Sequence, residues 1–231
     1  MKKYSFIKVF LALVLLTTNA CAMKNLKSTY DEKTQTTKYE KALKPPISIP
    51  FDITKQGNKI ELELKIKESN SYSFELEFHY DDPRRSKYWI VELVKHYLPQ
   101  KKYSDEEWNE VMKDYNRVYR LIGTEELVVD SKPEEAYKSH WVKYPGIPTP
   151  IHLTIIKLED DGSSKVVFDE VRDKWEGQNF VGCGPLSCNK ELERTGLEKA
   201  NYKISVQVIK DSPELANTKI HFAIGRGRIK Y

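Results

Sequence analysis

Long apolar runs are missing from this chain of 231 residues. The longest, residues 6–16, holds about 11 residues and is interrupted by Lys8, whereas a membrane-spanning helix needs roughly 20. No later stretch is longer. The sequence therefore predicts that nothing after this run spans a bilayer.

Motifs for two common kinds of chemistry are also absent. The chain has no G-x-S-x-G, the turn that exposes the nucleophile of one large class of serine hydrolases. It has no G-x-x-x-x-G-K-[ST], the loop that binds nucleotide phosphates. No other polar constellation indicates an active site, so we expect a protein that is not an enzyme and has no cofactor.

Excess charge of either sign is missing once the first 20 residues are set aside. The chain has 38 basic and 34 acidic residues, a net charge of +4, and residues 1–20 hold three lysines and no acid. Residues 21–231 therefore carry 35 basic against 34 acidic side chains. Without a net positive field, we expect no binding of nucleic acid.

The first 20 residues do have a recognisable plan, that of a signal peptide: a short basic start, an apolar core and small residues at the end. Small residues precede Cys21, which resembles a lipoprotein box, although Thr18 stands where that box usually has leucine. We expect cleavage before Cys21 and lipidation of its thiol. The alternative is the pattern Ala20-Cys21-Ala22, whose cleavage would remove Cys21. With Ala22 after the cysteine, the lipidated form is expected in the periplasm, anchored to the outer membrane.

Residues 21–45 are polar and offer almost nothing to bury, which predicts a flexible tether. A flexible chain of this length would span about 25–30 Å. Beyond it, residues 46–231 are expected to form one β-domain. Apolar and polar residues alternate over 47–53, 60–66 and 72–80, as in antiparallel strands with one face on a core.

A helical segment is predicted to interrupt the strands. Residues 104–107, Ser-Asp-Glu-Glu, resemble a capping box, apolar residues follow at helical spacing from Trp108 to Ile122, and Gly123 is placed to end the helix. Residues 87–98 are compatible with helix or strand. We treat residues 84–123 as an insertion.

Further strands are expected at residues 151–155, 166–171, 202–208 and 220–224, with a weaker candidate at 127–129. Together with the first three they make seven or eight. The predicted fold class is mainly β: an antiparallel, immunoglobulin-like β-sandwich with one inserted amphipathic helical segment.

Two groups of residues could form local sites. Cys183 and Cys188 are expected to form a disulfide in the oxidising periplasm, and no histidine or second cysteine pair lies nearby in the sequence to complete a zinc site. His79, His152 and His221 all fall on the polar phase of predicted strands, so they could converge on a metal ion if those strands were neighbours. We favour surface histidines and predict no metal site.

Aromatic residues are concentrated in and around the insertion. Tyrosine, tryptophan and arginine are the residues that dominate binding hot spots. Segments added to a scaffold commonly carry its function. The candidate partner-binding residues are Trp89, Tyr97, Tyr103, Trp108 and Arg117.

Several segments resemble a family of small bacterial envelope proteins described only as a domain of unknown function, many of which look like lipoproteins. The segments are PISIPFDI at 46–53, YSFELEF at 72–78, RVYRLIG at 117–123, GIPTPIHL at 146–153, NYKISV at 201–206 and PEL at 213–215. The stretch 84–116 and the loop between Cys183 and Cys188 do not share the likeness. Some such lipoproteins resemble immunity proteins encoded beside interbacterial toxins. The resemblance therefore implies a non-catalytic lipoprotein that binds another protein and neutralises a toxin; the alternative is a module that binds envelope glycan or lipid.

Overall fold

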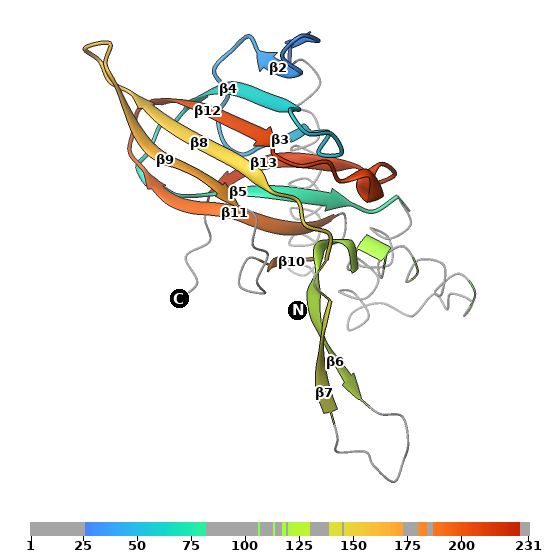
Figure 1. Cartoon of the computed structure of the whole chain (residues 1–231). Helices are drawn as coiled ribbons and strands as arrows, with labels where there is room; N and C mark the ends of the chain where they lie inside the picture. Colours follow the sequence, from blue (N-terminus) through green and yellow to red (C-terminus); the bar gives the residue numbers. More distant parts are fainter. Residues whose placement is uncertain are drawn as a thin grey trace, which may run out of the picture.

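The computed structural model contains two β-sheets packed face to face, and a separate two-stranded hairpin (Figure 1). It describes residues 26–81, 106, 113, 117–118, 120–129, 139–144, 146–172, 180–183 and 187–226. The predicted β-sandwich is confirmed. No helix in this described part is long and apolar enough to cross a membrane.

The larger sheet has six strands in the order β1-β2-β4-β12-β8-β9. All neighbours are antiparallel except β2 and β4, which run parallel. The strands are β1 (Ser28–Asp31), β2 (Thr36–Tyr39), β4 (Lys59–Lys65), β8 (Ile151–Leu158), β9 (Ser164–Arg172) and β12 (Asn201–Val208).

The smaller sheet has five strands in the order β10-β11-β5-β13-β3, all antiparallel. The strands are β3 (Ile47–Pro50), β5 (Asn70–His79), β10 (Phe180–Cys183), β11 (Ser187–Leu197) and β13 (Ile220–Arg226). The thirteen strands of the described part, which include β6 and β7 of the hairpin, exceed the seven or eight predicted. Among the missed strands, β1 and β2 are short and polar, and the buried Lys190 interrupts the apolar alternation of β11.

The core lies between the sheets and contains the apolar phase of the alternating segments, as predicted. Phe74, Leu76 and Phe78 of β5 and Phe222 of β13 are at most 1% exposed, and each such side chain contributes about 1.5–3 kcal/mol by leaving water. Arg172 joins the edges of the two sheets, because its side chain donates hydrogen bonds to the Leu192 carbonyl and the Glu193 carboxylate of β11. The sandwich is thereby closed along the β9–β11 side.

The tether predicted over residues 21–45 is wrong for residues 28–43. Residues 28–39 form a hairpin whose second strand pairs with β4, and Leu43 is buried and bridges to Leu64. Backbone hydrogen bonds hold this segment, among them Lys59 N–H to Gln35 O (2.9 Å) and Leu43 N–H to Glu63 O (2.7 Å). The edge of β4 therefore orders residues 28–39 through backbone hydrogen bonds, and Leu43 adds one buried apolar side chain.

The insertion between β5 and β8 begins after residue 81. Its described helical residues, 106, 113, 117–118 and 120–122, agree with the predicted helix. Gly123, at a φ of 76°, ends that helix as expected. The strand candidate at 127–129 is corrected: it belongs to β6 (Thr124–Val129), which pairs with β7 (Ser139–Tyr144) in a sheet of its own.

Candidate functional site

The base of the insertion is fixed to one end of the sandwich. Val118 and Ile122 are 0% and 1% exposed and belong to the core. Arg117, one of the predicted partner-binding residues, pairs with Asp81 (2.6 Å) and donates a hydrogen bond to the Thr218 hydroxyl (3.1 Å). Arg117 therefore anchors the helix where β5 ends and β13 begins. The other predicted partner-binding residues, Trp89, Tyr97, Tyr103 and Trp108, lie outside the described residues.

A buried lysine of the sandwich donates a hydrogen bond to the C-terminal end of the helix. Lys190 of β11 is 4% exposed, and its Nζ donates a hydrogen bond to the Ile122 carbonyl (2.8 Å), near the negative end of the helix. Burial lowers the pKa of Lys190 to about 6. Lys190 could not be recognised as buried from the sequence, because the region around it is rich in charged side chains that usually face water.

The β6–β7 hairpin projects away from the sandwich (Figure 1). Its register pairs Thr124 with Tyr144 and Leu127 with Trp141, and neither strand pairs with any other described strand. Both outer edges of the hairpin therefore present backbone groups that no described strand satisfies. Such edges are templates for pairing with another chain.

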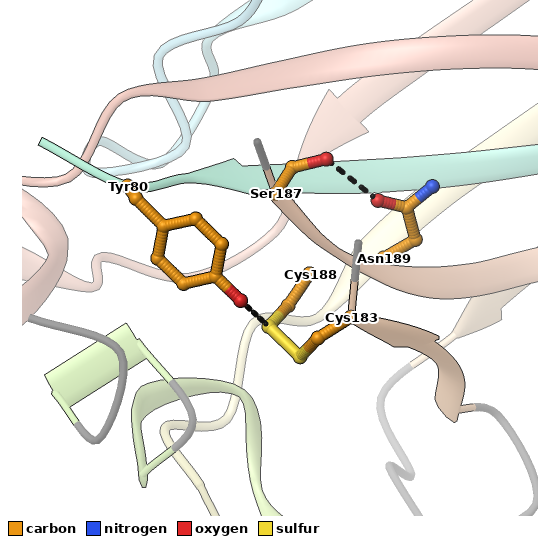
Figure 2. Close-up of a disulfide and its surroundings, with 5 residues drawn as sticks. All are labelled: Tyr80, Cys183, Ser187, Cys188 and Asn189. Atoms are coloured by element: carbon orange, nitrogen blue, oxygen red, sulfur yellow. Dashed lines mark hydrogen bonds between the residues drawn. A yellow bond between two sulfur atoms is a disulfide. The ribbon is translucent and has the colours of Figure 1, made fainter. Parts of the chain in front are cut away.

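The disulfide joins β10 and β11 at this same end of the fold. Cys183 and Cys188 face each other in the strand register with a Cα–Cα distance of 4.0 Å, as the sequence predicted. Figure 2 shows Tyr80 pointing toward the bond, and its hydroxyl donates to Sγ of Cys188 (2.8 Å). Because Tyr80 lies just before the insertion, the disulfide fixes the point where the insertion leaves β5.

The three histidines of the sequence pattern do not converge. His152 lies on β8 of the larger sheet, where its Nε2 contacts Asp169 Oδ1 (2.7 Å). His79 and His221 lie on neighbouring strands of the smaller sheet, with ring centres 4.4 Å apart, and Glu77 lies beside them. Strand phase predicted the face of each histidine, but the expectation of a surface histidine is wrong for His221, which is 9% exposed. Only the strand order could show which of the three meet.

The electrostatics around Glu77 favour a carboxylate next to a neutral imidazole. Burial raises the pKa of the Glu77 carboxyl, but the approach of His79 and the hydrogen bond from Ser48 outweigh this effect, so that the pKa lies below its usual range. Burial, helped by the charges of His79 and Lys219, lowers the pKa of His221 to about 4. At neutral pH, Glu77 is therefore ionised and His221 is neutral.

An open depression of about 530 Å³ lies on the outer face of the larger sheet. Glu61 pairs there with Lys59 (2.6 Å) and Lys38 (3.4 Å), and Tyr39 contributes an aromatic ring. Its volume is in the range of small-molecule sites, which are usually more apolar and more enclosed.

The fold defines the class of protein: a β-sandwich whose insertion between β5 and β8 carries a separate β-hairpin. Residues 48–226 match a family described as a domain of unknown function, DUF5625, and the chain belongs to that family. A crystal structure of a protein from Sulfurospirillum deleyianum is similar in fold, with a TM-score of 0.52 and 22% identity over 79% of this chain and 98% of that one. No curated protein matches the chain.

Proposed function

We propose that this protein is an exported, non-catalytic binding protein that uses the insertion between β5 and β8 to bind another protein. The observation that supports this function best is the β6–β7 hairpin, which stands apart from the sandwich (Figure 1). An isolated two-stranded sheet is only marginally stable in water. A partner chain that pairs with one of its edges would supply hydrogen bonds that no described strand provides.

The base of the insertion suits this role. Val118, Ile122 and Arg117 fix the helix to the sandwich, and the disulfide fixes the neighbouring strands. The hairpin is therefore presented from a rigid support, which lowers the entropic cost of binding.

The partner that we propose is a toxin delivered into the bacterial envelope, and the protein would then be an immunity protein. This choice rests on the resemblance to immunity lipoproteins. In this proposal the chain acts in the periplasm, anchored to the outer membrane through lipidated Cys21. Palmitate labelling of the protein in cells should be abolished by Cys21→Ala; labelling that persists would contradict the anchor.

The binding test compares two loop replacements in the full-length protein. A short Gly-Ser turn replaces residues 126–142 in one variant and residues 160–163 in the other, because the turn between β8 and β9 lies at the far end of the sandwich (Figure 1). Each variant is mixed with the toxin encoded by a gene that neighbours the gene of this protein. Replacing the hairpin should abolish co-purification and protection of the cell, whereas replacing the far turn should preserve both. If the hairpin variant, still folded by circular dichroism, keeps the partner, the proposal is wrong.

A second candidate function is recognition of envelope glycan or lipid, and the depression beside Tyr39 favours it. Binding there should change the fluorescence of the protein when cell-wall fragments are added, and Tyr39→Ala should remove the change. Replacing residues 126–142 should leave that signal intact, which separates the two functions.

A further inference from the structure

We propose that Glu77, His79 and His221 form a binding site for a divalent transition-metal ion, with zinc as the expected ion. The site is independent of the proposed protein-binding function. Each of the three residues offers one ligand atom, and these atoms all lie within 4.8 Å of one another. Two imidazole nitrogens and one carboxylate oxygen are a donor set that zinc uses, with a fourth position left for water or another ligand.

The strand register builds the cluster. His221 of β13 lies directly opposite Glu77 of β5, and His79 follows Glu77 by two residues. Because side chains on one face of a strand repeat every two residues, all three lie on the face of the smaller sheet that points away from the core. A backbone hydrogen bond from His79 N–H to Lys219 O (2.9 Å) holds the two strands together at this point.

Ser48 of β3 orients two of the ligands. Its hydroxyl donates to the Glu77 carboxylate and lies 2.9 Å from Nδ1 of His221. Since the single hydroxyl hydrogen is used toward Glu77, the serine oxygen accepts from Nδ1–H of His221. This hydrogen bond leaves the lone pair on Nε2 of His221, the arrangement that metal-binding histidines usually have.

Two nitrogens of the cluster have no hydrogen-bond partner in the part of the chain that the structure describes. Nε2 of His221 and Nε2 of His79 are both buried and unpartnered, and His221 is 9% exposed overall. The nearest carboxylate oxygen to His79 Nε2 is Glu77 Oε2 at 3.6 Å, too far for a hydrogen bond. An unsatisfied buried polar atom destabilises the folded state. A metal ion between the three side chains would satisfy both nitrogens and neutralise Glu77.

The contrast with His152 shows why the cluster is unusual. His152 also neighbours a carboxylate, but its Nε2 is 2.7 Å from Asp169 and the side chain is 36% exposed. That histidine has a hydrogen-bond partner and access to water. It needs no metal ion, and His152→Ala is therefore a matched control.

Zinc binding to the metal-free, oxidised protein tests the site, since the disulfide keeps Cys183 and Cys188 from binding zinc. After exposure to zinc and gel filtration, about one equivalent should remain with the wild type and with His152→Ala. His221→Ala and the milder His79→Gln should lose it. Uptake equal to the wild type in both of these variants, or no uptake by the wild type, would overturn the site.

A second measurement does not depend on the removal of a ligand. Cobalt in a four-coordinate site with nitrogen and oxygen ligands gives an intense visible absorption band, which we expect for the wild type. Ser48→Ala should keep the band and weaken zinc affinity by about 10–100-fold, the usual effect of losing a residue that orients a metal ligand. Unchanged affinity in Ser48→Ala, or a weak octahedral spectrum, would contradict the proposed geometry.

Discussion

Replacing Lys190 with methionine should make the stability of this protein less dependent on pH. Lys190 is 4% exposed, and burial lowers its pKa from 10.5 to about 6. Between these two values, the unfolded chain binds a proton that the folded chain does not. The free energy of unfolding therefore rises with pH across this window, by up to about 1.4 kcal/mol per pH unit.

The expected size follows from the two pKa values. Between pH 6.5 and pH 8.5 the wild type should gain about 2.5 kcal/mol from this residue alone. Methionine has a similar shape and no charge, so Lys190→Met should lack that gain. At pH 7 the variant avoids a cost of about 5 kcal/mol for keeping the amine neutral. It leaves the Ile122 carbonyl without this donor, which costs about 1–3 kcal/mol. The variant should therefore be the more stable protein at pH 7.

Urea unfolding of both proteins, followed by tryptophan fluorescence at several pH values, measures the difference. Other titrating groups affect both proteins alike, so the difference between the two curves isolates Lys190. Parallel curves between pH 6.5 and pH 8.5 would show that the lysine stays charged in the folded state, and the reasoning would fail.

Three further changes test the packing. Gly146→Ala should cost at least 2 kcal/mol more than Gly162→Ala in urea unfolding: both glycines have positive φ, but a Cβ at Gly146 would lie 2.5 Å from a backbone atom and one at Gly162 would meet nothing. Equal costs would contradict the close contact. Leu43→Ala should lower the free energy of unfolding by about 2–4 kcal/mol because the side chain is buried. A loss below about 1 kcal/mol would contradict the packing of this segment and support the predicted tether. Replacing Cys183 and Cys188 by serine should lower stability by about 2 kcal/mol, the entropy of a short loop, and unchanged thermal unfolding would refute it.

Much of the scaffold could be predicted from the sequence because burial there follows a simple period. Residues 60–66 and 72–78 alternate without interruption, and the same residues face the core in the structure. Gly123 could be recognised as a helix end because few other residues adopt a positive φ.

The elements that could not be predicted from the sequence do not follow such a period. In β11 the core-facing residues are Cys188, Lys190 and Leu192, so a charged side chain interrupts the apolar phase. The first hairpin, residues 28–39, is held by backbone hydrogen bonds, which any sequence can make. The Glu77–His221 contact depends on strand order, and sequence phase assigns a face without a neighbour.

The folded domain begins only a few residues after Cys21, which limits how far a lipid anchor could hold the domain from a membrane. Leu26 already packs against the core. A fully extended chain from Cys21 to Leu26 reaches no more than about 18 Å. A lipid on Cys21 would therefore keep the β1–β2 end close to the headgroups. The β6–β7 hairpin lies at the opposite end of the molecule (Figure 1), so in the proposed anchored form it would point away from the membrane.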